Sequence, residues 1–367
     1  MEKATVLKLN LPRGRRVLAV SDIHGDLLLL RRLLDMARFS QDDILFVLGD
    51  LLEKGEQSLA TLRYLMALSK NHTVYTLNGN CDDLVTGFVD GREELSDKFF
   101  RYFIGLFGRR STLVQMGLEA GLAEAELDDY PKFRAVLRKK FQPEFDFLRA
   151  LPTIIDTPNL LFVHGGVPSD ENMEALDAWR CMKNDDFALQ DFSLSKWCVV
   201  GHTPATLYRP KIPCANPFIQ PEKRLISIDG GCSIKADGQL NLLILPDGYS
   251  TDFSFLSADA LSAVTALDAQ PPSPDSVNIR WGHNTLELLE HGEEFSRCYH
   301  AESGRTVDIL TDYLATGKDG VLRCADSTDY LLPVSPGDTL SVVRETSRGL
   351  LAKKAGVTGW YLGRTGS

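Results

Sequence analysis

The sequence predicts an α/β fold, because the first 245 residues contain both strand-like runs and a long helix-like segment. Two observations support this prediction. Short runs of β-branched, leucine and aromatic residues end at glycine or a polar residue, which is typical of buried strands. Between Asp83 and Glu144, apolar residues instead recur at three- and four-residue spacing, which is typical of helices. The strand-like runs are residues 17–20, 44–48, 73–77, 160–163 and 197–200.

A residue able to bind a metal follows each of these runs. Asp22 and His24 follow the first run, and residues two apart on an extended strand share a face and can share one ion. Any one such residue alone is more often part of a turn or a structural histidine. Because ligands collect beyond the carboxyl ends of strands in an open α/β sheet, the whole set predicts one site for two metal ions. Its members are Asp22, His24, Asp50, Asn80, His164 and His202.

The ordered motifs D-x-H, G-D, G-N, H-G-G and G-H-T resemble those of the calcineurin-like metallophosphoesterases. Two further segments, 147–152 and 226–231, are similar to the branch that contains serine/threonine protein phosphatases and diadenosine tetraphosphatases. The resemblance extends from Arg16 to Leu245. It implies a four-layer sandwich, in which two mixed β-sheets lie face to face and helices flank them.

The resemblance also implies the parts that the ligands play. Asp22 and His24 would hold one metal, Asp50 would bridge both, and the other three residues would hold the second. Manganese, iron, zinc, nickel and cobalt all suit such oxygen and nitrogen ligands. The implied reaction is hydrolysis of phosphate esters by a hydroxide that bridges the two metals.

Three functions remain open at this point. The first is a serine/threonine-phosphatase-like enzyme acting on a phosphoprotein or a small phosphoester. The second is a phosphodiesterase or dinucleotide polyphosphate hydrolase that uses the same site. The third is a regulatory pseudoenzyme that acts through its C-terminal module.

Two motifs depart from the family pattern. Cys81 stands where the family has a histidine near the leaving group, and Glu53 and Lys54 replace the aspartate and arginine of the second motif. General acid catalysis contributes ~10²–10⁴-fold, so the departures predict a weak protein phosphatase or a substrate with a good leaving group. Some small phosphodiesterases of the superfamily carry G-N-C-D here, which favours diesters. The candidate catalytic residues are Asp50, Cys81 and Glu53, and the candidate substrate-binding residues are Lys54, Arg180 and Asn80.

The domain organisation follows from changes in pattern. We expect a catalytic domain at 1–255 with a helical insertion at about 84–144, in which residues 118–127 form one helix. A proline-rich stretch within 256–274 is typical of a linker. Residues 275–367 contain short β-like runs, and their last part is similar to a small SH3-type barrel.

The composition is that of an ordinary globular enzyme. The net charge of -10 argues against general binding to nucleic acid, because phosphate backbones demand a basic surface. No apolar run is long enough to span a bilayer, so we expect no membrane partner. The seven cysteines, an odd number, fit a reducing compartment and a cytoplasmic location. The expected partner is therefore a phosphorylated substrate.

Overall fold

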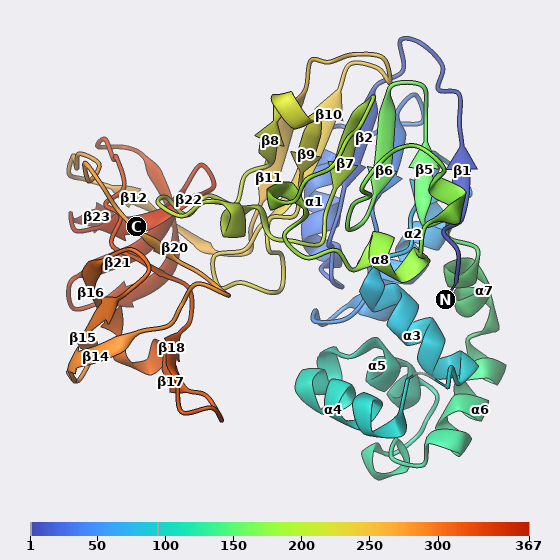
Figure 1. Ribbon diagram of the computed structural model, residues 1–367, viewed down its shortest axis with the longest axis horizontal. Helices are drawn as coiled ribbons and strands as arrows, with labels where there is room; N and C mark the ends of the chain where they lie inside the picture. The colour runs from blue at the N-terminus through green and yellow to red at the C-terminus, as the bar shows by residue number, and fades with distance from the viewer. Residues whose placement is uncertain (1, 94, 367) are drawn as a thin grey trace. The chain divides into compact units, whose positions relative to one another are not determined.

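The computed structural model describes residues 2–93 and 95–366. The chain divides into two compact units, which are considered separately (Figure 1). The first unit contains residues 1–204 and 217–259, and the second contains residues 205–216 and 260–367. Most of the segment expected to be a linker, 256–274, belongs to the second unit.

Two sheets form the framework of the first unit, and the mixed α/β class is confirmed. The five-stranded sheet has the order β11 (Ser254–Ala258), β10 (Leu240–Leu245), β2 (Val17–Val20), β3 (Ile44–Val47) and β4 (Thr73–Thr76). The six-stranded sheet has the order β1 (Val6–Lys8), β5 (Ile154–Asp156), β6 (Leu160–Val163), β7 (Trp197–Val200), β9 (Leu225–Ser227) and β8 (Phe218–Gln220). Strands β2, β3 and β4 are parallel to one another, as are β6, β7 and β9. The carboxyl ends of each parallel set therefore lie at one edge of its sheet.

The two sheets pack face to face through alternate residues of their strands. In β2, Val17 and Ala19 belong to the core between the sheets, whereas Leu18 belongs to the core beneath the helices. This alternation is expected of a strand that is buried on both faces. Phe46 of β3 and Phe162 of β6 stack between the sheets, with their ring centroids 4.0 Å apart.

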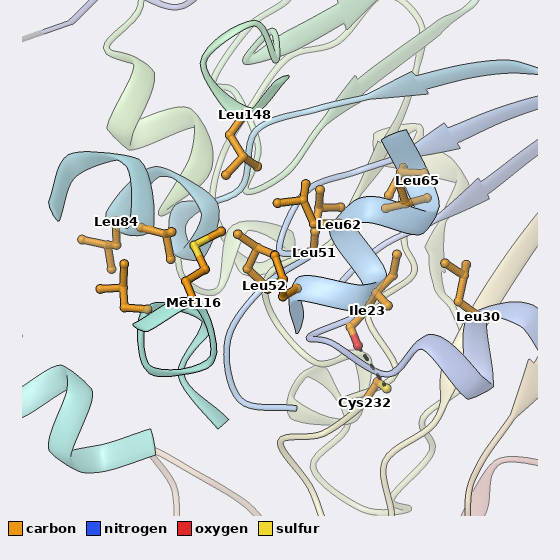
Figure 2. Packing of buried hydrophobic residues seen from close by; sticks show 14 of the residues in the cluster. Ile23, Leu30, Leu51, Leu52, Leu62, Leu65, Leu84, Met116, Leu148 and Cys232 are labelled. Carbon is orange, nitrogen blue, oxygen red and sulfur yellow. Dashed lines mark hydrogen bonds between the residues drawn. The ribbon is translucent and has the colours of Figure 1, made fainter. Parts of the chain in front are cut away.

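Helices cover the other face of the five-stranded sheet. α1 (Leu27–Met36) and α2 (Ser58–Leu68) contribute leucines such as Leu62 to this core (Figure 2). Cys232 reaches the same core, and its thiol donates a hydrogen bond to the carbonyl oxygen of Ile23 at 3.7 Å. Buried side chains of this core therefore hold the turn that contains Ile23, between Asp22 and His24, in place.

A series of helices separates β4 from β5, and one further short helix follows β6. The expectation of a helix over 118–127 is wrong. The helix there ends at Glu119, because Gly121 adopts a positive φ of 88°, and only a 3-10 turn, Glu124–Glu126, follows. The helices are α3 (Asn80–Asp90), α4 (Asp97–Phe107), α5 (Thr112–Glu119), α6 (Tyr130–Lys140), α7 (Gln142–Arg149) and α8 (Ala178–Met182).

The second unit consists of short strands around two separate apolar cores. Leu340 and Tyr361 belong to one core, and Ile279 and Val307 belong to the other. The largest sheet has the order β22 (Val357–Tyr361), β21 (Gly349–Lys354), β20 (Thr339–Thr346), β12 (Ser262–Ala266) and β23 (Thr365–Gly366). The remaining strands are β13 (Asn278–Ile279), β14 (Glu287–Glu290), β15 (Phe295–His300), β16 (Arg305–Leu310), β17 (Leu314–Thr316), β18 (Leu322–Cys324) and β19 (Ser327–Thr328).

Strand β12 lies in the segment that was expected to be a linker, and it pairs with β20. The pairing partner lies more than seventy residues further along the chain, so local composition gave no sign of this strand. Among the described residues, none of the helices combines the length and the apolar character needed to cross a membrane.

Candidate metal centre

The turns after β2 and β3 pair with each other through their backbones. The amide of Asp22 donates to Gly49 O at 3.2 Å, and the amide of His24 donates to Asp50 O at 3.0 Å. These bonds continue the parallel pairing of β2 with β3 beyond the strands themselves. The first two motifs are therefore held side by side before any side chain is considered.

Asp50 lies at the middle of the cluster. Its Oδ2 is 3.6 Å from His24 Nε2, and its Oδ1 is 3.4 Å from His164 Nε2. Asp22 Oδ1 lies 3.7 Å from the same nitrogen of His24. Potential ligand atoms of Asp22, Asp50 and His164 all lie within 4.8 Å of one another, and so do those of His24, Asp50 and Cys81. Two groups of ligands thus share Asp50.

The remaining two expected ligands adjoin His164. Asn80 is the first residue of α3, and its Oδ1 lies 3.3 Å from His164 Nε2. The ring of His202 lies edge-on to that of His164, with centroids 5.2 Å apart. The structure therefore brings together all six side chains that the sequence singled out. Their parts as metal ligands remain our proposal.

Backbone carbonyls orient two of the imidazoles. His24 Nδ1 lies 3.1 Å from Leu52 O, and His164 Nδ1 lies 2.7 Å from Leu48 O. A carbonyl can only accept, so Nδ1 of each ring carries a proton and Nε2 faces the centre, where it offers a lone pair once it is deprotonated. This is the orientation that metal-binding histidines commonly show.

Four of the expected ligands have left-handed backbones. The φ angles are 53° for Asp22, 47° for His24, 49° for Asp50 and 68° for His202. Positive φ is uncommon for residues other than glycine and costs of order 1–3 kcal/mol each, less for Asp and His than for branched residues. Such strain persists only where surrounding structure imposes it, and it gathers at functional sites.

Glycines of one motif make room for carboxylates of another. A Cβ on Gly201 would overlap Ser21 Oγ and Asp22 Oδ2, and a Cβ on Gly79 would overlap the backbone nitrogen and Oδ1 of Asp50. The His202 amide, next to Gly201, donates to Asp22 Oδ2 at 2.9 Å. The G-H-T turn therefore presses directly on the first ligand, and the G-N turn presses on the shared one.

The buried charges shift one another's pKa values. Burial, together with the Lys54 ammonium, lowers the pKa of His24 to about 4. Burial alone would also lower the pKa of His164, but the negative charges of Asp50 and Asp22 outweigh it and raise that pKa to about 9. For Asp50, burial favours protonation, yet the two imidazoles and Lys54 hold its pKa well below the usual range. The cluster thus favours positive charge at its centre.

The donor set fits metal ions. Asp22 Oδ2 accepts from the His202 amide and from the Ser21 hydroxyl, while the buried Oδ1 has no hydrogen-bond partner among the described residues. A buried carboxylate oxygen without a partner is costly unless a cation meets it. Carboxylate and imidazole ligands around one shared aspartate suit a pair of divalent ions such as Mn²⁺, Fe²⁺ or Zn²⁺.

Lys54 and Cys81 lie at the centre rather than beside it. Lys54 Nζ is 3.1 Å from His24 Nε2 and 4.0 Å from Asp50 Oδ2. Burial works against the charge of Lys54, but Cys81, Asp50 and Asp22 raise its pKa above the usual value. The amide of Cys81 donates to Asp50 Oδ1 at 2.9 Å, and its thiol belongs to the ligand group with His24. Both residues therefore lie among the candidate metal ligands.

The carboxylate of Glu53 lies at the start of α5. Its Oε1 accepts from the Thr112 amide at 2.9 Å and from the Ser111 hydroxyl at 3.3 Å, so it caps α5. Burial raises its pKa to about 7. These contacts hold the carboxylate at the start of α5, and the expected catalytic part of Glu53 stays a prediction.

Sequence reasoning missed three acidic residues around the centre. Asp82 accepts from the amides of Leu51 at 3.1 Å and Gly79 at 3.1 Å, which fixes the loop behind Asp50. Asp229 is fully buried, and burial together with Asp22 raises its pKa. The D-D pair after G-N-C and the I-D-G-G segment were the available signals.

The third missed residue, Asp185, lies 2.8 Å from His202 Nε2 through its Oδ1. The hydrogen bond from His202 lowers the pKa of Asp185 below its usual range.

Arg180, the expected phosphate contact, lies on α8 with an exposed side chain, and its amide donates to Asp177 Oδ1 at 2.9 Å. α8 itself adjoins the centre, because Cys181 O accepts from the Gly165 amide at 2.8 Å.

Known proteins resemble this chain in sequence and in fold. It is 41% identical over 80 residues to the symmetrical bis(5'-nucleosyl)-tetraphosphatase of Aeromonas salmonicida (strain A449), which is 22% of this chain and 29% of that protein. It is 25% identical over 201 residues to the asymmetrical bis(5'-nucleosyl)-tetraphosphatase PrpE of Geobacillus sp. (strain WCH70), which is 50% of this chain and 69% of that protein. The Aeromonas match therefore spans less than a third of the relative's length.

Among solved structures, a protein serine/threonine phosphatase from Saccharomyces cerevisiae with similarity to human phosphatase PP5 aligns with a TM-score of 0.41 and 11% identity, over 71% of this chain and 85% of that one. The family model described as calcineurin-like phosphoesterase matches residues 15–217, which include all six clustered ligands. More than half of the chain fits that model, and the chain belongs to the calcineurin-like phosphoesterase family.

Proposed function

We propose that this chain is a metal-dependent phosphoester hydrolase that works with two metal ions. The observation that carries the proposal is Asp50, whose two oxygens face two different imidazoles, His24 and His164. A shared carboxylate between two ligand groups is the arrangement that a dinuclear centre requires. The family uses such a centre, and these residues are suited to form it.

Asp22, His24 and Asp50 would hold one ion, and Asp50, Asn80, His164 and His202 would hold the other. The metal pair, when bound, supplies Lewis-acid polarisation of the phosphate ester and a nucleophile at neutral pH. Residues of the chain itself orient the two imidazoles and the phosphate ester. Leu48 O and Leu52 O fix the two imidazoles, and Lys54 brings a positive charge against the non-bridging oxygens of the ester.

The identity of the substrate depends on the leaving group. Cys81 replaces a histidine of the family motif, and a buried thiol is a poor proton donor for a departing serine alkoxide. A nucleoside phosphate or a phenolate leaves without such help. We therefore place phosphodiesters and nucleoside polyphosphates ahead of phosphoserine. The names of the Aeromonas and Geobacillus relatives support this order.

Two further proposals concern the rest of the chain. The second unit would serve as a small SH3-like module, built on the sheet that contains β20 and β21, and it would contribute no catalytic residue. All seven cysteines are free, which supports a reducing and hence cytoplasmic location. The six clustered ligands, all present, favour an enzyme over a regulatory pseudoenzyme.

One comparison tests the proposed function. The chain supplied with Mn²⁺ is assayed with p-nitrophenyl phosphate, bis(p-nitrophenyl) phosphate, diadenosine tetraphosphate and a phosphoserine peptide. We expect turnover of the diester and the dinucleotide to exceed that of the peptide and to vanish on chelation. Absence of turnover with all four substrates and every divalent metal tried would refute the proposal.

A further inference from the structure

Two helices that contain or neighbour candidate ligands line a hollow of about 460 Å³. Residues of α3 and α8 line it, among them Leu84, Trp179 and Arg180. Both helices reach the centre directly, because α3 begins at Asn80 and the residue after α8, Lys183, has its Nζ 3.4 Å from His202 Nε2. A substrate held by the metals can therefore extend into the hollow.

Trp179 is an exposed aromatic side chain in this hollow. It is 39% exposed, whereas Leu84 and Met182, which line the same hollow, are 8% and 2% exposed. An exposed indole over an apolar floor presents a flat surface on which a second ring can stack. Exposed large aromatics beside a functional cleft are typical of ligand-binding surfaces.

The Arg180 guanidinium in the hollow is available to bind a phosphate group, because other residues pair with the neighbouring charges. Asp83 is paired with Arg92 at 2.7 Å, and the Asp177 carboxylate caps α8 by accepting from the Arg180 amide. Within the residues that the structure describes, no ion pair or hydrogen bond engages the guanidinium of Arg180. It can therefore bind a phosphate in the two-pronged manner of arginine. Glu2 also lines the hollow, where its carboxylate can accept from an amino or hydroxyl group.

We propose that this hollow is a nucleotide subsite, in which Trp179 stacks on the base and Arg180 binds a phosphate outside the metal centre. The inference rests on the proposed function and adds the side chain that would bind the base of a nucleotide substrate. A hollow of this size accommodates a nucleoside, and stacking on an aromatic side chain strengthens binding about 5- to 150-fold per base. A phosphotyrosine ring is the competing ligand, but it would leave the Arg180 guanidinium without a second phosphate.

Equilibrium binding to the chain with Mn²⁺ tests the subsite without any turnover. The probes are AMP, ADP, ribose 5-phosphate and phosphotyrosine, measured by isothermal titration calorimetry. We expect AMP to bind at least about tenfold more tightly than ribose 5-phosphate, because only AMP carries a base. Trp179→Ala should remove most of that difference, and Trp179→Phe should retain most of it.

The controls separate the base from the phosphate. Arg180→Ala should lose the advantage of ADP over AMP and keep the preference for AMP over ribose 5-phosphate. Trp281→Ala changes another exposed tryptophan, 67% exposed in the second unit, and should bind all probes as the unmodified chain does. If Trp179→Ala does not fold, Trp179→Leu supplies an apolar side chain without a stacking face.

Two results would overturn the inference. One is equal affinity for AMP and ribose 5-phosphate, or a preference that survives both the Ala and the Leu replacement of Trp179. The other is tighter, Trp179-dependent binding of phosphotyrosine than of AMP. Neither result would touch the proposed hydrolase, which stands on the turnover of bis(p-nitrophenyl) phosphate by the unmodified chain.

Discussion

Replacing Gly201 with alanine should distort the metal centre through a single added methyl group. The new Cβ would overlap Ser21 Oγ and Asp22 Oδ2 and lie 2.8 Å from Ser21 Cβ, closer than real Cβ contacts. Gly201 does not require a positive φ, so the effect is steric and not conformational. Overpacking of this kind costs about 1–3 kcal/mol. For a unit of this size, that corresponds to a fall in Tm of about 2–12 °C.

The assay combines calorimetric unfolding in chelator with metal analysis after dialysis against Mn²⁺. We expect the Gly201→Ala variant to melt earlier and to retain less metal, because Asp22 must move. Gly105→Ala is the matched control, since Gly105 lies inside α4 with nothing within 4 Å of an added Cβ. That control should gain about 0.5–1 kcal/mol from helix propensity. A Gly201→Ala variant with unchanged Tm and full metal content would refute the close approach of the two motifs.

Four further outcomes are expected. The Asp50→Asn variant should bind less than half the metal and lose hydrolysis while keeping its fold. The control is Asp42→Asn, which changes an exposed carboxylate, and full metal content with near-normal turnover in Asp50→Asn would contradict the shared ligand. Cys81→His should raise the hydrolysis of alkyl phosphates more than that of p-nitrophenyl phosphate. Equal changes for the two substrates, or the same gain in Cys81→Ser, would show that position 81 does not act on the leaving group. The metal-free chain should lose about 2 kcal/mol of stability from His164 alone as pH rises from 6.5 to 8, because a histidine whose pKa is raised to about 9 stabilises the fold while protonated. Denaturant unfolding in chelator at the two pH values measures this change, and a higher free energy of unfolding at pH 8 would contradict it. A chain ending at Asp259 should still hydrolyse bis(p-nitrophenyl) phosphate, because every clustered ligand lies in the first unit; a folded, inactive truncation would place the second unit in the active site.

The clustering of the six candidate ligands could be predicted from sequence because each lies within four residues of the end of its strand. A run such as 44–48 gives both the strand and the place where Asp50 leaves it. What the sequence could not reveal was the backbone at these points. Asp22, His24 and Asp50 adopt positive φ, a conformation that glycine usually signals, and here contacts from neighbouring turns impose it instead.

Longer-range features were less accessible. The place of Glu53 in the second motif makes it a candidate catalytic residue, and no pattern in the sequence indicates that its carboxylate accepts from the Thr112 amide at the start of α5. β12 looked like a linker because a five-residue strand is recognised mainly through its partner, and β20 lies far along the chain. In both cases the deciding contact joins segments that sequence spacing does not relate.

The close approach of glycines to residues of other motifs has an evolutionary consequence. Gly201 is confined to glycine by the Ser21 hydroxyl as well as by the Asp22 carboxylate, and Gly79 by the backbone nitrogen as well as by the carboxylate of Asp50. A descendant that lost the Asp22 carboxylate would still need glycine at position 201 until Ser21 changed too. Gly79 would stay glycine after any replacement of the Asp50 side chain, because the backbone nitrogen of residue 50 remains. The glycines of this architecture would therefore outlast the metal ligands in a lineage that had lost metal binding.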